Sequence, residues 1–273
     1  MFDYTGRTAL VTGASSGLGK EFAYQLAAKG MRLVLTARSE QKLEMVADDL
    51  LARHGQPVEV MAADLTRPGS AEDLRRAVAA RNLRVDLLVN NAGVCAYGDF
   101  ETVAPATNPQ LVALNVAALV AMTEAFAPAM LERRHGAIVN VASGAAFQPM
   151  PYMTTYAATK AFVLSFSEGL WAEYRRRGVH VMVFCPDHTQ TPLVDALPAT
   201  CPYATAPGAD AAAMVASGLR GLERGRHYAV GGGLKAYLRS NLARWLPRAT
   251  VALISESMHR ARPAERLLKG AKS

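Results

Sequence analysis

Only three cysteines occur among the 273 residues: Cys95, Cys185 and Cys201. So few cysteines cannot form the disulfide framework of a small secreted domain, and they fit a reducing compartment. The sequence also lacks any run of about 18 uncharged apolar residues, and its first residues lack the basic and apolar regions of a signal peptide. These absences predict a cytoplasmic protein without a membrane span.

The positive charge of the chain, +7 in total, is unevenly distributed. From Arg220 to the C-terminus there are twelve Lys and Arg against three Asp and Glu, so residues 1–219 carry a net charge of −2. This basic part contains no recognisable groove-reading motif or base-stacking platform, so we do not expect nucleic acid as a partner. Hydrophobic residues make up 51% of the chain, which favours a folded protein over a disordered one.

Short apolar runs alternate with helical patterns through the first two-thirds of the sequence. The runs are nearly continuous in apolar residues, as strands of a parallel sheet are when both faces are buried. The predicted strands are Thr8–Thr12, Arg32–Thr36, Val58–Ala62, Asp86–Asn90, Ala137–Ala142 and Val179–Cys185. The predicted helices include Leu18–Lys29, Glu40–His54 and Ala71–Arg81. This alternation predicts an α/β fold with a Rossmann-type doubly wound parallel sheet in a single domain.

A glycine-rich turn directly follows the first predicted strand, with the sequence Thr12-Gly13-Ala14-Ser15-Ser16-Gly17-Leu18-Gly19. Gly13 can make the tight turn, while Gly17 and Gly19 allow close backbone approach to a pyrophosphate and close helix–strand packing. The N-terminus of the following helix adds free N–H groups and a partial positive charge for an anion. Glycines also serve ordinary turns, and the spacing is GxxxGxG rather than GxGxxG. The strand–loop–helix context favours a dinucleotide site.

The tip of the second predicted strand offers Arg38, 19 positions beyond Gly19, where an NAD site usually has an acidic residue. A carboxylate would repel a 2′-phosphate, whereas a guanidinium can bind it with paired hydrogen bonds. Arg38 therefore indicates NADP(H) as the cofactor. The alternative is a solvated residue at the start of a helix.

Tyr156 and Lys160 stand four positions apart on a predicted helix, so their side chains share one face. A nearby ammonium lowers the pKa of a phenol, which makes it a usable general acid or base. Ser143, just after the strand Ala137–Ala142, is placed to hydrogen-bond a substrate oxygen that gains charge. A Tyr–Lys pair alone is more often a surface pair, and the combination with Ser143 and the glycine loop makes it specific. No metal site is predicted.

With these residues, the chain resembles the short-chain dehydrogenase/reductase family, of the NADP(H)-preferring type. The resemblance covers about Thr5–Thr191 and includes the glycine loop, Asp64, Asn90-Asn91-Ala92-Gly93, Asn115, Ser143 and Tyr156-Ala157-Ala158-Thr159-Lys160. It implies that Tyr156 exchanges a proton with the substrate oxygen, and that Lys160 binds the nicotinamide ribose and lowers the Tyr156 pKa. It further implies that Asn115 holds a water that links Lys160 to solvent. The implied cofactor contacts are Gly13, Ser15, Ser16, Gly17, Leu18, Gly19, Arg38, Asp64, Leu65, Asn91, Ala92, Gly93, Tyr156, Lys160, Pro186, Thr189 and Thr191.

The chain departs from the family after the sixth predicted strand, where the family usually has Pro-Gly. Here Pro186 is followed by Asp187 and His188. A side chain at Asp187 beside the nicotinamide is expected to alter how the cofactor docks or to position a polar substrate group. For His188 we expect a loop position facing solvent rather than a catalytic role.

Residues 187–210 contain four prolines and no sustained periodicity, so we expect a lid over the site, with a passive surface excursion as the alternative. The residues expected on the substrate side are apolar, which predicts a hydrophobic ketone or secondary alcohol such as a lipid, steroid or polyketide-like molecule. They are Val94, Tyr97, Phe147, Met150, Met153, Leu193 and Leu197. These positions could equally belong to the core.

We expect residues 1–233 to form the dinucleotide-binding and catalytic domain, and residues 234–273 a basic amphipathic C-terminal extension in two helical pieces. The favoured role of the extension is to cover the substrate cleft. Peripheral contact with an anionic membrane or a partner subunit is the alternative. The resemblance also suggests a homodimer or homotetramer.

The sequence thus predicts an NADP(H)-dependent oxidoreductase that interconverts a carbonyl and a secondary alcohol. The alternative is a catalytically silent module that senses the dinucleotide without turnover.

Overall fold

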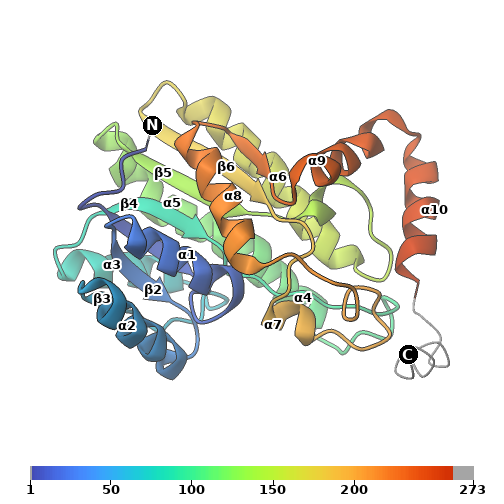
Figure 1. Cartoon of the computed structure of the whole chain (residues 1–273), viewed down its shortest axis with the longest axis horizontal. Helices are drawn as coiled ribbons and strands as arrows, with labels where there is room; N and C mark the ends of the chain where they lie inside the picture. The colour runs from blue at the N-terminus through green and yellow to red at the C-terminus, as the bar shows by residue number, and fades with distance from the viewer. Residues whose placement is uncertain (1, 261–273) are drawn as a thin grey trace.

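A computed structural model describes residues 2–260 of the chain. Its centre is a sheet of seven strands in the order β3-β2-β1-β4-β5-β6-β7, and all recorded pairings between neighbouring strands are parallel (Figure 1). The strands are β1 Thr8–Thr12, β2 Arg32–Thr36, β3 Val58–Val60, β4 Val85–Asn90, β5 Gly136–Val141, β6 Val179–Cys185 and β7 Tyr228–Val230. Every residue of β1, β4 and β5 is buried, which explains why these strands read as continuous apolar runs.

Helices cover both faces of the sheet, which confirms the predicted doubly wound arrangement. The apolar residues of α1, α2 and α8 form one core layer with the sheet, and those of α3, α5 and the end of α6 form the other. The helices are α1 Gly17–Ala28, α2 Glu40–His54, α3 Ser70–Ala80, α4 Thr107–Val112, α5 Leu119–Glu132, α6 Thr154–Tyr174, α7 Pro192–Asp195, α8 Ala211–Glu223, α9 Gly233–Leu242 and α10 Arg248–His259. Short helical turns η1 Ala113–Ala118, η2 Gly144–Phe147 and η3 Ala243–Trp245 complete the structure.

The sheet order reverses between β1 and β4. The chain builds β1, β2 and β3 outward in one direction and then returns to place β4 on the other side of β1. In doubly wound sheets, this reversal opens a crevice beyond the carboxyl ends of the strands, and ligands bind there. The topology therefore fixes where the loops after β1, β2, β4, β5 and β6 meet.

Apart from one-residue shifts in the bounds of some elements, three features differ from the sequence-based expectation. The strand β7 was not predicted, because its three residues are too few to give a periodic pattern. The third strand ends at Val60 instead of Ala62. The segment 187–210 is not wholly irregular, since it contains α7 and a parallel bridge between Thr189 and Ala209.

The extension forms two helical pieces, α9 and α10, as expected, and they lie at one edge of the molecule (Figure 1). The part of the extension beyond residue 260 lies outside the described residues.

The continuous helical stretch Thr107–Glu132 is long and apolar enough to cross a membrane by length and composition, with a mean hydropathy of 1.7. It buries residues such as Met122 and Met130 in the core layer beside β4 and β5. Its apolar composition thus has a structural reason within this fold.

Candidate active site

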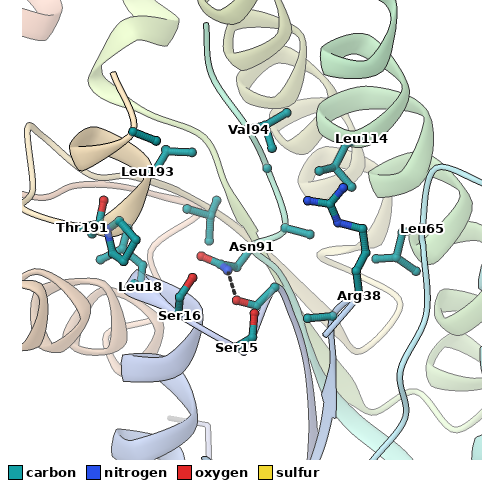
Figure 2. A pocket seen from close by; sticks show the side chains of 18 of the residues that line it. Ser15, Ser16, Leu18, Arg38, Leu65, Asn91, Val94, Leu114, Thr191 and Leu193 are labelled. Carbon is teal, nitrogen blue, oxygen red and sulfur yellow. Dashed lines mark hydrogen bonds between the residues drawn. The ribbon is translucent and has the colours of Figure 1, made fainter. Parts of the chain in front are cut away.

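A cleft with a volume of about 770 Å³ lies beyond the carboxyl ends of the strands, at the sheet reversal. Figure 2 shows the glycine loop, Arg38 and Asn91 around it. The cleft is lined by fifteen of the seventeen residues predicted to contact the cofactor: Gly13, Ser15, Ser16, Gly17, Leu18, Arg38, Asp64, Leu65, Asn91, Ala92, Gly93, Tyr156, Lys160, Pro186 and Thr191. Gly19 and Thr189 are not among the lining residues.

The glycine loop is held by close contacts with the loop after β4. A Cβ atom at Gly19 would lie 2.2 Å from the Gly13 carbonyl oxygen and 2.4 Å from Asn91 Nδ2, so only glycine fits there. Asn91 Nδ2 donates to the Thr12 carbonyl oxygen at 2.9 Å, and the Thr12 hydroxyl accepts from the backbone N–H of Asn91 and Ala92. Gly19 thus serves helix–strand packing, and Asn91 shapes the loop as well as lining the cleft.

The N-terminus of α1 is suited to a phosphate. Its N-cap residue, Ser16, makes no side-chain capping bond, and its first turn has no acidic residue. The backbone N–H groups of that turn therefore remain available for an anion at the cleft. This arrangement, with the glycine cradle, fits the pyrophosphate of a dinucleotide.

Two cations lie at the end of the cleft formed by β2 and the start of α2. Arg38 and Lys42 are both exposed lining residues, and Ser39 caps α2 beside them. Asp64 lines the same end, and hydrogen bonds from the Thr66 hydroxyl and backbone N–H lower the pKa of its carboxyl. Lys42 was missed by the sequence analysis, although its place one helical turn after Arg38 was a usable signal. This end of the cleft fits a ribose phosphate.

Tyr156, near the start of α6, is half-buried and lies beside Ser143, which caps η2 after β5. Burial raises the pKa of the Tyr156 phenol well above its usual range, and a hydrogen bond with Ser143 only partly offsets this effect. The Ser143 hydroxyl also accepts from the backbone N–H of Ala145 at 3.1 Å, which fixes its position. The phenol is therefore protonated at neutral pH and ready to donate a proton.

Lys160 lies one turn further along α6, with Nζ 5.8 Å from the centre of the Tyr156 ring. Its side chain is buried, and Nζ donates to the Val141 carbonyl oxygen at 2.9 Å. Burial lowers the pKa of this ammonium to about 8. Lys160 was expected to lower the Tyr156 pKa, but in the structure the burial of the phenol outweighs any such effect.

Asn115 lies in η1, a π-helical turn between α4 and α5, a local geometry found often at functional sites. Its side chain exchanges hydrogen bonds with the backbone N–H and carbonyl of Val94, both at 2.9 Å, and donates to the Thr159 hydroxyl at 3.1 Å. The amide thus ties the loop after β4 to α6. The water relay assigned to Asn115 stays a prediction.

Asp187 does not line the cleft, contrary to the expectation that its side chain lies beside the nicotinamide. Its carboxylate forms an ion pair with Arg239 of α9. A Cβ at Gly232 would come 2.9 Å from Asp187 Cβ, so the turn before α9 packs closely on this residue. The departure from the family pattern thus attaches the C-terminal extension to the loop after β6.

The neighbours of Asp187 also differ from expectation. The Thr189 hydroxyl donates to the Asp187 carbonyl oxygen at 2.7 Å and is buried, away from the cleft lining. His188 does not face solvent freely: it is half-buried, with Nε2 3.1 Å from the Ala206 carbonyl oxygen and its ring beside Tyr203. Both residues fold segment 187–210 onto itself.

The position of Asp187 away from the cofactor can be tested by removing its ion pair with Arg239. We expect Asp187→Asn to change kcat and the KM for NADPH by less than about twofold, because an exposed ion pair away from the cleft contributes little. Amide exchange in α9 should become faster, because its tie to the loop is weakened. Steady-state kinetics and hydrogen exchange measure the two effects. A tenfold rise in the KM for NADPH would instead place the carboxylate beside the cofactor.

An apolar cluster packs around Tyr156. It includes buried Met150 and Met153 and half-buried Tyr97, three of the residues predicted on the substrate side, and also Tyr203 from segment 187–210. Phe147 packs elsewhere, against Tyr228, while Val94 and Leu193 line the cofactor cleft itself.

Cys95 and Cys185 lie in apolar surroundings. Burial raises the pKa of the Cys95 thiol to about 11 and that of Cys185 to about 12, so both thiols are protonated at neutral pH. Within residues 2–260, no group of three or more His, Cys, Asp and Glu is arranged to hold a metal ion.

Comparison with known proteins shows which family the chain belongs to. The family model for short chain dehydrogenases matches residues 7–202. A very-long-chain 3-oxoacyl-CoA reductase of Anas platyrhynchos is 37% identical over 192 residues, which are 68% of this chain and 61% of the relative. The match thus spans about three-fifths of the length of that relative.

Solved structures match over a larger part of the chain. A short-chain dehydrogenase from Sphingobium yanoikuyae in complex with NADPH is 32% identical, with a TM-score of 0.79 over 94% of this chain and 97% of that one. A bulky-bulky ketone specific alcohol dehydrogenase from Comamonas testosteroni is 31% identical, with a TM-score of 0.75 over 95% and 98%. A short chain dehydrogenase/reductase from Burkholderia phymatum in complex with NAD is 27% identical, with a TM-score of 0.77 over 96% of this chain and 99% of that one. The chain therefore belongs to the short-chain dehydrogenase family.

Proposed function

We propose that this protein is an NADP(H)-dependent oxidoreductase that interconverts a carbonyl and a secondary alcohol on a hydrophobic substrate, with Tyr156 as general acid and base. One observation carries the proposal. The Tyr156 phenol, which is hydrogen-bonded to Ser143 and has its pKa raised by burial, lines the same cleft as the glycine loop and also belongs to the apolar cluster. No observation favours the alternative of a silent sensing module.

In carbonyl reduction, the residues of the site would have the following roles. Bound in the cleft, NADPH would supply a hydride to the substrate carbonyl carbon. Ser143 would donate a hydrogen bond to the substrate oxygen, and Tyr156 would deliver the proton that this oxygen takes up. Lys160 would hold the ribose hydroxyls and place positive charge beside the phenol. Met150 and Met153 would exclude water from the reacting atoms.

Three findings support NADP(H) as the cofactor. Arg38 and Lys42 line the cleft beyond β2, no acidic residue follows at the tip of that strand, and the Sphingobium yanoikuyae structure holds NADPH. We expect the Arg38→Asp variant to raise the KM for NADPH by about 100-fold, because a guanidinium–phosphate pair is replaced by repulsion. The KM for NADH should change by less than about threefold. An undiminished preference for NADPH would remove the role given to Arg38.

A hydrophobic substrate is supported by the apolar cluster beside Tyr156, and by the names of two similar proteins, the very-long-chain 3-oxoacyl-CoA reductase and the bulky-bulky ketone specific alcohol dehydrogenase. The test is a panel of ketones from small and hydrophilic to large and apolar, followed by the loss of NADPH absorbance. Turnover confined to small hydrophilic compounds would contradict the proposal. The cytoplasmic location and the homodimer or homotetramer stay predictions.

A further inference from the structure

Large apolar side chains are exposed mainly in one part of the molecule. Fourteen large hydrophobic residues are exposed within the described chain, and nine of them lie between residues 234 and 258. These nine are Leu234, Tyr237, Leu238, Leu242, Trp245, Leu246, Leu253, Ile254 and Met258, which we call the outer apolar face. A concentration of this kind on a folded surface marks an interaction site.

In the two helices of the extension, most of the large apolar residues are exposed and most of the buried residues are small or polar. In α9 the buried residues are the small Ala236 and Ser240, and in α10 they are Val251, Ser255 and His259. The exposed sides carry the leucines, Ile254 and Met258 instead. A helix that only covered the body would bury its large apolar residues and expose polar ones. The outer apolar face therefore fits a further, apolar environment.

The orientation of α10 is fixed by hydrogen bonds to three loops around the substrate side. The Tyr97 hydroxyl donates to the His259 carbonyl oxygen at 2.7 Å, and the Tyr203 hydroxyl lies 2.7 Å from His259 Nε2. The Tyr152 hydroxyl donates to Glu256 at 2.5 Å. Tyr97 and Tyr203 belong to the apolar cluster around Tyr156. The inner side of α10 thus packs against the apolar cluster around Tyr156, while the outer apolar face is exposed. That the extension covers the substrate cleft stays a prediction.

Charge distinguishes between the possible partners of this face. Residues 234–260 contain five Lys and Arg and one Glu. Lys235 and Arg248 are exposed, and the described part of the chain records no ion pair for either. A second copy of the chain in a two-fold contact would place these like charges opposite each other. An anionic surface would be attracted to them.

Trp245 is the most exposed of the nine residues, at 85%. Its ring is apolar and its N–H is polar, which suits the boundary between lipid headgroups and acyl chains. Lys and Arg around an apolar face are likewise typical of helices that lie in this boundary.

We propose that α9, η3 and α10 form a docking surface for an anionic lipid membrane, with the outer apolar face entering the acyl boundary and Lys235 and Arg248 contacting the headgroups. A membrane on this side would lie next to the cover of the substrate cleft. A hydrophobic substrate dissolved in the membrane would then be close to the site. The docking itself is independent of turnover and of the substrate proposed above.

The test is co-sedimentation of the full chain with vesicles of phosphatidylglycerol and phosphatidylcholine, and with phosphatidylcholine alone. We expect binding to the anionic vesicles that weakens with salt. The variant Leu238→Ser, Leu242→Ser and Trp245→Ser should lower the partition coefficient at least about tenfold. Reversing charge with Lys235→Glu and Arg248→Glu should lower it by about tenfold or more. The matched control, Met45→Ser with Leu51→Ser, removes exposed apolar groups from α2 and should bind as the wild type does.

A second measurement leaves all residues of the outer apolar face in place. In a Trp171→Phe background all tryptophan fluorescence comes from Trp245, and its emission should shift to shorter wavelength with anionic vesicles. No pelleting and no shift at low salt would overturn the proposal. It would equally be overturned if the triple serine variant turned a dimer into a monomer in sedimentation velocity without changing vesicle binding, because the face would then join two copies of the chain.

Discussion

The Tyr156→Phe variant is expected to lose at least about 10³-fold in kcat for ketone reduction while still binding NADPH. General acid catalysis by a positioned side chain contributes about 10² to 10⁴-fold, and here the phenol is protonated and hydrogen-bonded to Ser143. Removing one hydroxyl leaves the ring in its apolar cluster, so the melting temperature should move by only a few degrees. Single-turnover kinetics and NADPH titration by fluorescence separate the two effects.

Tyr97→Phe is the matched control for this variant. It removes a phenol hydroxyl from the same apolar cluster, but that hydroxyl donates to the His259 carbonyl oxygen and not toward Ser143. We expect kcat to stay within about fivefold of the wild type. Full activity of Tyr156→Phe on any accepted ketone would rule out the proposed proton donor.

The second large effect is expected from Lys160→Met, which should abolish activity and yet stabilise the fold. Burial lowers the pKa of this ammonium from 10.5 to about 8, so the folded state disfavours the charged form. At about pH 7 the lysine is protonated in both states, and the full cost of burying the charge is present. Losing the bond to the Val141 carbonyl oxygen offsets part of the gain. We expect the free energy of unfolding to rise by about 1 to 3 kcal/mol.

The sign of the pH dependence follows from the same shift. Between about pH 8 and 10.5 the folded lysine releases its proton before the unfolded one does, so the wild type gains stability as the pH rises. The advantage of Lys160→Met should therefore shrink over this range. Denaturant unfolding at about pH 7 and about pH 9.5 measures it, with exposed Lys20→Met as the control. A variant less stable at both pH values would mean that Lys160 supports the fold instead.

Much of the fold could be predicted because buried parallel strands leave a local signal. Six of the seven strands appear as apolar runs, and the glycine loop has a spacing that its backbone requires, as the close contact of Gly19 with Gly13 explains. The seventh strand, β7, has only three residues, and it is placed by pairing with β6 rather than by its own pattern.

The candidate site was predictable where residues act through a motif, and less so where they act through distant contacts. Tyr156 and Lys160 share a helix face in any helix of that sequence. Asp187 could not be assigned to Arg239, because 52 residues separate them and only the packing of α9 brings them together. The rise of the Tyr156 pKa was likewise not predicted, because it is caused by burial, and burial is a property of the whole fold.

The sequence by itself determined the first six strands and the helices between the first of them, the glycine loop, the Tyr–Lys pair and the basic charge of the C-terminal part. These depend on neighbouring residues, whose spacing sets backbone geometry and shared faces. Only the tertiary structure decided which side of α10 is buried, that its last residue, His259, is tied to Tyr97 and Tyr203, and that the large apolar residues of the extension point outward. Burial and partner choice depend on segments that are far apart in the chain, so a local pattern cannot specify them.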